Sequence, residues 1–251
     1  MKSPTTEKTQ ARSALYGTIA LAFLYPEQGS AALLKGQANE LSAWTSEAGW
    51  REVAEGLNSI CGALESLDDG ELLEQYIDTF GHSVSGDCPP YASEYGQAHV
   101  FQKTQTLANL ASFYRAFGMK LNPEFRDRPD HLGVQLEFMQ LLTLKEAYAR
   151  MNNHGRAKTS ICRKAQKAFL TQHLSPWISE FTRRLRRKTS IHRIYYSFAG
   201  LLEAFMKLEL KSHGIDSISI PIENTDSTLV EDEGCEASLL TFDAAQEDSC
   251  L

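Results

Sequence analysis

The sequence predicts an all-α protein, a single-domain helical bundle of about eight to ten helices. Two observations support this fold class. Apolar residues recur every three or four positions through most of the chain, as in amphipathic helices, and the alternation typical of strands is nearly absent. The chain has 251 residues, of which 42% are hydrophobic and 23% charged, so it can bury one large core.

The clearest helical periodicity lies in three stretches, residues 11–24, 98–118 and 190–211. Each places its apolar side chains on one face of a helix. The second and third stop at Gly118 and Gly214, because glycine readily ends a helix. Weaker helical patterns fill the ranges 30–43, 47–65, 70–80, 156–172 and 175–187.

The two ends of the chain differ from its middle. We expect residues 1–10 to be disordered, residues 11–214 to form one helical domain, and residues 215–251 to form an acidic, disordered tail. Residues 221–251 carry nine of the 32 acidic residues and none of the 25 basic ones, so the remaining chain is almost neutral. The only strand-like alternation, at 215–222, lies where this tail begins.

Cysteine usage and hydropathy indicate where the protein works. The five cysteines form neither close pairs nor a repeated spacing, which favours reduced thiols over disulfides or a zinc site. Residues 1–12 are polar, and the first apolar run, 14–25, is broken by Gly17 and is too short to span a bilayer. We therefore expect a cytoplasmic protein without a signal peptide, stable membrane insertion or a metal site.

Signatures of nucleic-acid binding and catalysis are weak. The basic run Arg183–Lys188 ends a predicted helix, where it complements the helix dipole, and the acidic chain argues against nucleic acid. Gly81 and Gly86 match a phosphate-binding loop, but Asp87 and Cys88 stand where that loop needs Lys and Ser or Thr. The Glu-x-x-His, HExxH and G-x-S-x-G patterns are absent. We expect no enzymatic activity and no bound cofactor.

A predicted helix that opens at Asp130 is the most informative stretch. It is apolar over most of its circumference, so we expect it to be central and buried. Asp130, Gly133, Glu137 and Gln140 share a third face. A carboxylate face beside a glycine is suited to line a groove for a peptide. Alternatively, Asp130 only caps the helix, as the neighbouring Pro129 favours, and Glu137 pairs with an arginine inside the bundle.

A segment rich in glycine, proline and serine, Gly81–Gly96, is predicted to be a loop. Its double proline holds the approach to Tyr91 extended. Glu94 lies in this loop between two tyrosines, either on the rim of the groove or tying down the loop through backbone N–H groups. A second loop, 122–129, separates two strong helical stretches.

Two motifs occur in order along the chain. The string PPYASEYG carries Pro89, Pro90, Tyr91, Glu94, Tyr95 and Gly96. The string PDHLGVQLEFM carries Asp130, His131, Leu132, Leu136, Phe138 and Met139. Together they resemble the TorD/DmsD/NarJ family of redox-enzyme maturation chaperones. LAFLYP, residues 21–26, also fits the family's first helix, whereas Gln135 stands where relatives often have Glu. The resemblance covers residues 11–212 and leaves out the acidic tail.

The resemblance implies a cytoplasmic chaperone for the catalytic subunit of a molybdenum-containing oxidoreductase. It would assist cofactor insertion and assembly and shield any twin-arginine export signal, which has a basic and an apolar region. The predicted client-binding residues are Tyr91, Glu94, Tyr95, Asp130, His131, Glu137 and Phe138. The carboxylates of Asp130 and Glu137 would meet the basic region, and the aromatic rings would form apolar walls. The client is not identified, and both a monomer and a domain-swapped dimer remain open.

Two other functions also remain open. One is a nucleotide-dependent enzyme or weak hydrolase that uses Asp130 and His131. Adjacent helix residues point about 100° apart, however, and do not naturally form one acid–base unit. The other is a carrier that brings the molybdenum cofactor to its client. A chaperone would bind one protein stoichiometrically without turnover, whereas an enzyme would lose its rate in a His131→Ala variant.

Overall fold

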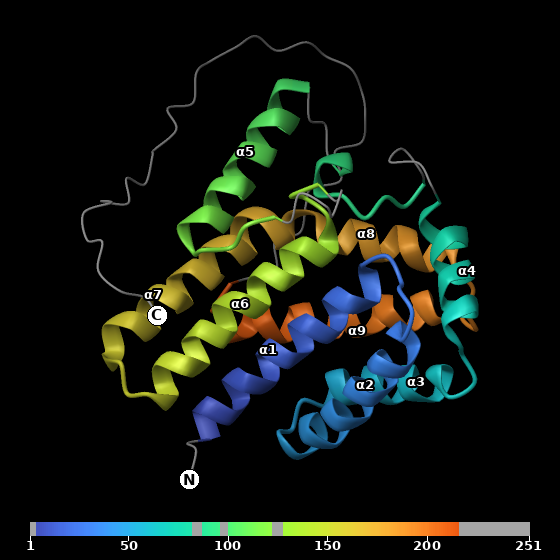
Figure 1. The fold of residues 1–251 in the computed structure, drawn as a ribbon, viewed down its shortest axis with the longest axis horizontal. Coiled ribbons are helices and arrows are strands. Elements are labelled where there is room, and N and C mark those ends of the chain that lie inside the picture. Colours follow the sequence, from blue (N-terminus) through green and yellow to red (C-terminus); the bar gives the residue numbers. More distant parts are fainter. Residues whose placement is uncertain (1–3, 82–86, 96–99, 122–127, 216–251) are drawn as a thin grey trace. The chain divides into compact units, whose positions relative to one another are not determined.

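The computed structural model describes residues 4–81, 87–95, 100–121 and 128–215. Within these ranges the chain forms nine α-helices and no strand, which confirms the all-α prediction (Figure 1). The helices are α1 (Pro4–Phe23), α2 (Ser30–Glu47), α3 (Arg51–Leu64), α4 (Asp69–Phe80), α5 (Val100–Ala116), α6 (Leu132–Met151), α7 (Gly155–Phe169), α8 (Ser175–Lys188) and α9 (Ile194–Ser212). A short 3₁₀ turn, η1 (Ala92–Glu94), precedes α5, and a π-helical segment, η2 (Leu170–Leu174), joins α7 to α8.

Most helices begin and end within a few residues of the predicted ranges, with two larger differences. α1 begins at Pro4, although residues 1–10 are predicted to be disordered. Its first turns are ordered by packing, since Thr9 is buried. α6 continues past the predicted end at Leu142 to Met151, because its later turns also bury side chains. Propensity alone does not reveal such packing, which extends both helices.

Several predictions fall on residues outside those described. The predicted acidic tail and its strand-like start lie almost entirely in 216–251. Parts of the two predicted loops lie in 82–86, 96–99 and 122–127. The described remainder of the first loop is irregular apart from the η1 turn, as its prolines predict.

Helices α1 and α6 pack against each other through the middle of the helical domain (Figure 1). A glycine on each helix permits the close approach. A Cβ added at Gly133 would lie 2.6 Å from Leu24 Cδ2, and one added at Gly17 would overlap the Gln140 side chain. The face of α6 that carries Gly133 and Gln140 is therefore occupied by α1. The interpretation that this face lines a peptide groove is wrong at these two positions.

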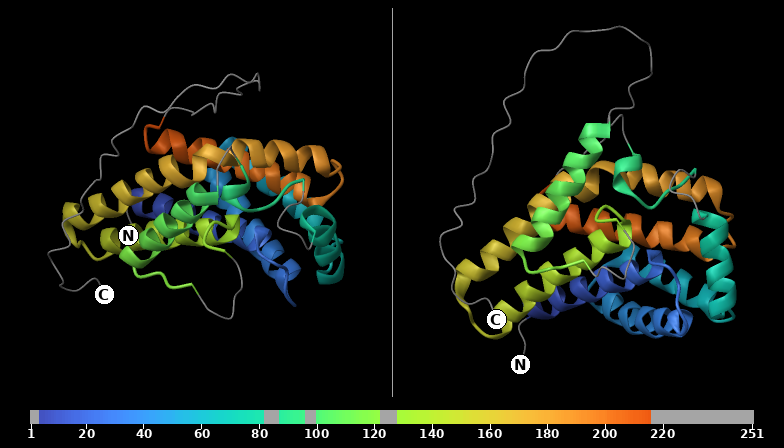
Figure 2. Two further views of the ribbon diagram at one scale, coloured as in Figure 1. Left: turned by 90° about the horizontal axis from the view of Figure 1, so that it is seen from above. Right: turned by 45° about the horizontal axis from the view of Figure 1, so that its top comes forward.

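A cluster of aromatic rings forms the core between α1, α4, α8 and α9. The Phe23 ring centroid lies 5.6 Å from that of Phe181 and 6.3 Å from that of Phe80. Tyr195 packs edge-on against Phe80 at 5.1 Å. Edge-to-face pairs of this kind contribute about 0.5–1.5 kcal/mol each beyond the burial of their area. Figure 2 shows the same helices from two further directions.

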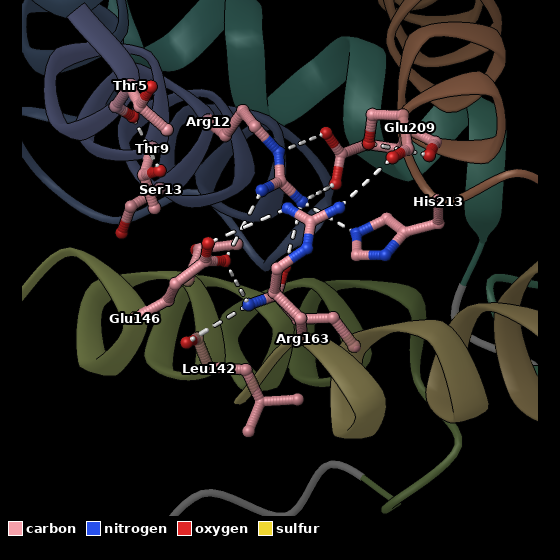
Figure 3. A network of polar contacts seen from close by, with 12 residues as sticks. Thr5, Thr9, Arg12, Ser13, Leu142, Glu146, Arg163, Glu209 and His213 are labelled. Carbon is pink, nitrogen blue, oxygen red and sulfur yellow. Dashed lines mark hydrogen bonds and ion pairs between the residues drawn. The ribbon is translucent and has the colours of Figure 1, made fainter. Parts of the chain in front are cut away.

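A buried polar network joins the first helix of the bundle to the last (Figure 3). Arg12, which is 6% exposed, donates Nε and Nη2 to the two carboxylate oxygens of Glu209, each at 2.6 Å. Its Nη2 also donates to Gln166 Oε1 at 2.8 Å and lies 2.9 Å from His213 Nε2. Tyr16 donates its hydroxyl to Glu209 at 2.8 Å. The charge of Glu209 is thus compensated by two side chains of α1, Arg12 and Tyr16.

Glu146 of α6 is the second buried carboxylate of the network (Figure 3). Arg150 Nη2 donates to it at 2.7 Å and Gln166 Nε2 at 2.9 Å, while Arg12 and Arg163 approach to 3.6 Å. Burial by itself would raise the pKa of Glu146. The hydrogen bonds from Arg150 and Gln166 and the charge of Arg12 outweigh burial and lower that pKa. Glu146 is therefore charged at neutral pH and holds α1 and α7 on α6.

Replacing Arg12 should destabilise the bundle severely. Arg12→Ala leaves two buried carboxylates without their shared cation, so we expect the free energy of unfolding to fall by about 3–5 kcal/mol. Arg51→Ala is the matched control, because Arg51 pairs with Glu55 on the surface, with side chains 88% and 62% exposed. That change should leave the urea midpoint almost unchanged, because solvent and salt screen an exposed ion pair. Urea unfolding measures both, and similar losses in the two variants would contradict the prediction.

Mild acid should also lower stability. Burial lowers the pKa values of His173 and His213 to about 4, and the charge of Arg12 adds to the effect at His213. Histidine in the unfolded chain titrates near pH ~6.5, so below this pH the unfolded state binds more protons than the native state. We expect a loss of about 2 kcal/mol per histidine between about pH 7 and 5 in urea unfolding. A His213→Asn variant should show a shallower loss, and a flat wild-type profile would contradict this expectation.

Candidate functional site

The two sequence motifs meet at the start of α6. Tyr91 of the first motif and His131 of the second form an isolated antiparallel bridge. Next to it, the backbone N–H of Leu132 donates to the carbonyl of Pro90 at 2.8 Å. Motifs separated along the chain are therefore neighbours in space, joined through their backbones.

The buried side chain of Asp130 fastens the two motifs together. Arg128 donates Nε to Oδ1 and Nη2 to Oδ2, both at 2.9 Å. The backbone N–H of Ser93 donates to Oδ2 at 3.0 Å. The carbonyl of Asp130 accepts the N–H of Ala92 at 3.0 Å and Nε2 of Gln135 at 2.9 Å. A buried carboxylate is stable only when it is paired and hydrogen-bonded, so Asp130 fixes both segments that satisfy it.

Asp130 does not cap α6, contrary to one interpretation of the sequence. The N-cap is His131, whose Nδ1 accepts the backbone N–H of Gly133 at 3.1 Å. The His131 ring also packs edge-on against the Tyr91 ring, with centroids 5.2 Å apart. Asp130 and His131 are 0% and 1% exposed. Both side chains are thus occupied in holding the motifs and do not form an acid–base pair open to a substrate.

Arg128 connects the buried aspartate to the accessible part of the site. Its guanidinium lies 4.8 Å from the Tyr91 ring centroid, and its Nη1 donates to Glu94 Oε1 at 3.2 Å. Lys103 of α5 donates Nζ to the other Glu94 oxygen at 3.0 Å. Burial would raise the pKa of Glu94, but the two cations outweigh it and lower that pKa. Among the described residues, Glu94 ties down the loop through side-chain cations and not through backbone N–H groups.

Tyr95 packs on α8. Its hydroxyl donates to the carbonyl of Pro89 at 2.9 Å, and its ring centroid lies 5.2 Å from that of Trp177. The Arg184 guanidinium covers the ring at 4.7 Å while its Nε donates to Glu180 at 2.8 Å. One residue of the basic run Arg183–Lys188, Arg184, therefore covers the Tyr95 ring.

The remaining two predicted residues lie further along α6. Glu137 is exposed, so its carboxylate lies at the surface of α6 and not inside the bundle, where one interpretation placed it. Phe138 is 0% exposed, and its ring centroid lies 4.8 Å from those of Tyr114 and Phe169. Phe138 therefore belongs to the core between α5, α6 and α7. It does not form the wall of a surface groove.

Four of the seven predicted residues are brought together by the structure: Tyr91, Glu94, Asp130 and His131. Of the other three, Tyr95 packs against α8, and Glu137 and Phe138 lie further along α6. Sequence reasoning missed Arg128 and Lys103. A basic residue two positions before the motif aspartate was a usable signal for Arg128. Lys103 gave none, because its contact depends on where α5 lies.

The described part of the chain offers little support for a metal site, a membrane-spanning helix or a reactive thiol. No three His, Cys, Asp or Glu side chains there gather so that they could hold a metal ion. None of the described helices is sufficiently long and apolar to cross a membrane. The described cysteines, Cys61, Cys88 and Cys162, form no disulfide with one another, and burial raises the pKa of Cys88 to about 11. Cys88 is therefore an unreactive core thiol.

The contacts of Asp130 with Arg128, Ser93 and Ala92 form a clamp between the two motifs, and neutralising Asp130 should loosen it. In Asp130→Asn, Arg128 and the Ser93 N–H lose their charged acceptor, so the free energy of unfolding should fall by about 2 kcal/mol. Hydrogen exchange at the Ser93 and Ala92 amides should quicken about tenfold. Glu40→Gln, which neutralises an exposed carboxylate on α2, serves as the control and should change neither quantity. Unchanged exchange at Ser93 in Asp130→Asn would contradict the role given to this carboxylate.

Comparison with known proteins identifies related chains. A perchlorate reductase assembly chaperone protein from Dechloromonas aromatica (strain RCB) is 26% identical over 220 residues, covering 82% of this chain and 91% of that protein. A selenate reductase assembly chaperone protein from Thauera selenatis is 38% identical over 99 residues, covering 39% and 50%. The chaperone protein TorD from Vibrio cholerae serotype O1 (strain M66-2) is 29% identical over 150 residues, covering 59% and 64%. The second and third matches span less than two thirds of those relatives.

A family model also matches the chain. The model described as nitrate reductase delta subunit matches residues 45–183, just over half of the chain. This range contains both motifs and Arg128, so the clamp described above lies wholly inside the matched region. The resemblance predicted from the two motifs is confirmed. The chain belongs to the nitrate reductase delta subunit family of redox enzyme maturation chaperones.

Proposed function

We propose that this protein is a cytoplasmic assembly chaperone for the catalytic subunit of a molybdenum-containing reductase. The observation that carries the proposal is the family match over residues 45–183, which includes both motifs and the clamp between them. Relatives described as assembly chaperones of perchlorate and selenate reductases support a client of that class. The chaperone binds its client stoichiometrically and releases it unchanged.

The client surface consists of the accessible residues Tyr91 and Glu94 at the clamp, Tyr95 packed on α8, and Glu137 further along α6. The tyrosine rings are partly exposed and supply apolar area, while the two glutamates supply negative charge. A twin-arginine signal combines a basic with an apolar region, so it matches this surface in both respects. Charge complementarity of this kind guides association and suppresses wrong partners.

Glu94 offers a specific way to recognise a basic segment. Its side chain is 19% exposed and its partner Lys103 is 36% exposed, so the ion pair between them is open to competition. An arginine of the client replaces Lys103 and forms a bidentate pair with the carboxylate, which a lysine cannot do. Arg128 keeps its own contacts to Glu94 and the buried aspartate during this exchange.

The buried members of the predicted set act as positioning residues. Asp130 and His131 hold the first motif against the start of α6, and Phe138 anchors α6 in the core. They influence client binding by fixing the accessible side chains and make no direct contact. The same burial removes support for a hydrolase that uses Asp130 and His131.

The first test is recovery of the client. The tagged protein, expressed in its native cells during growth on an anaerobic electron acceptor, is purified and its bound proteins are identified by mass spectrometry. We expect one reductase catalytic subunit in near-equal amount. Recovery of no redox subunit, while such an enzyme is expressed, would contradict the proposed function.

The second test concerns the client surface alone. Glu94→Gln combined with Glu137→Gln should weaken binding of the client's signal peptide about tenfold at low salt, because both accessible carboxylates are lost. Glu40→Gln combined with Glu47→Gln removes two exposed charges from α2 and should leave the affinity within about twofold. Fluorescence anisotropy of a labelled peptide measures both. Equal affinities in the two double variants would place the client elsewhere without affecting the first test.

A further inference from the structure

A pocket of about 690 Å³ lies beside α7 and shares no residue with the client surface. One face of α7 forms most of its wall: Arg156, Thr159, Ser160, Arg163, Lys164 and Lys167. These positions recur at the three- and four-residue spacing that places side chains on one side of a helix. Arg150 from the end of α6 and His213 at the end of α9 also line the pocket.

The pocket is strongly positive. Arg150, Arg156, Arg163, Lys164 and Lys167 line it, and no carboxylate does. The nearest acidic groups of the network, Glu146 and Glu209, are both 0% exposed. Glu209 pairs with the buried Arg12, and Glu146 pairs with Arg150 and Arg163 of the wall. Two carboxylates therefore offset only part of this positive charge and leave Arg156, Lys164 and Lys167 uncompensated.

Several of these cations have N–H donors without an acceptor among the described residues. Among the described residues, neither Arg156 nor Lys164 forms an ion pair or a side-chain hydrogen bond. Arg163 donates Nη2 to the carbonyl of Ser212 at 3.1 Å, and Lys167 lies 3.5 Å from the carbonyl of Gly214. A guanidinium carries five N–H donors and an ammonium three, so these contacts leave most of them available.

The inner wall is rigid because it is the outer side of the buried network. His213 is 8% exposed and contacts Arg12, and Arg163 reaches from the pocket wall to Glu146 (Figure 3). Along α7, Arg156 and Lys164 are separated by about 12 Å, which leaves room for several anionic groups in a row. Thr159 and Ser160 add hydroxyl groups between them. The pocket thus offers fixed cations and hydroxyls without requiring a rearrangement of the bundle.

We propose that this pocket binds a small organic molecule that carries two or more linked phosphate groups. Phosphates are the anions that arginine forks and lysine ammonium groups bind most strongly, and hydroxyl groups assist by donating to their oxygens. The pocket volume lies within the range of about 300–1,000 Å³ found for small-molecule sites. An acidic protein segment is the competing ligand, and the test below separates it from a phosphate compound.

The test measures binding of inorganic tripolyphosphate to the full chain by isothermal titration calorimetry at low ionic strength. We expect one saturable site, with affinity about tenfold lower in Arg156→Gln combined with Lys164→Gln. Lys158→Gln combined with Arg187→Gln is the matched control. It also removes one lysine and one arginine, both exposed and both outside the pocket, and should keep the affinity within about twofold. Circular dichroism and thermal unfolding verify that both double variants remain folded.

Three outcomes would overturn the proposal. Wild-type protein that shows no saturable binding has no such site. If the affinity for tripolyphosphate fell equally in the two double variants, binding would depend only on the net charge of the chain and not on the pocket. An octaglutamate peptide that binds at least as tightly, and loses affinity only in the pocket variant, would assign the pocket to an acidic protein segment. Client recovery in the pull-down is independent of all three.

Discussion

The bundle depends on the ion pair between Arg12 and Glu209, which joins its first helix to its last. Both groups are almost completely removed from water, and an unpaired charge in that position would cost several kcal/mol. Burial therefore makes the pairing obligatory once these helices pack. The same guanidinium approaches Glu146, so one cation fixes α1, α6 and α9 together. The geometry of both candidate sites follows from how these helices are held.

The clamp around Asp130 uses the same physical device for a different purpose. A buried carboxylate again requires an arginine and a backbone N–H, but here its partners belong to a loop and not to a packed helix. The loop that carries Tyr91 and Glu94 has few regular hydrogen bonds of its own. The contacts of Asp130 fix the position of this irregular segment, so its accessible side chains are held in one arrangement.

Helix α6 relates the two surfaces to each other. The clamp lies at its N-terminal end, Glu137 lies in its second turn, and its last turn carries Arg150 at the edge of the basic pocket. A helix of 20 residues is about 30 Å long. The client surface and the basic pocket are therefore separated by more than a Debye length at physiological ionic strength, about 8 Å, so the charges of one are largely screened from the other.

The sequence by itself determined the helices, their approximate ends and the family. Periodicity of 3.6 residues and the glycines at 118 and 214 are local signals, and they are read without knowing what each helix contacts. The two motifs likewise identified the chaperone family before any packing was known. Both kinds of information reside in short stretches of chain, so one sequence is enough to recover them.

Only the tertiary structure decided which of the motif residues are accessible. Asp130, His131 and Phe138 proved to be buried supports, and Gly133 proved to face α1. The partners responsible, such as Arg128 and the neighbouring helices, approach from distant parts of the chain. The basic pocket was equally hidden, because the α7 face becomes a pocket wall only when the ends of α6 and α9 lie beside it. Burial is a property of the assembled packing, and no local pattern in the sequence determines it.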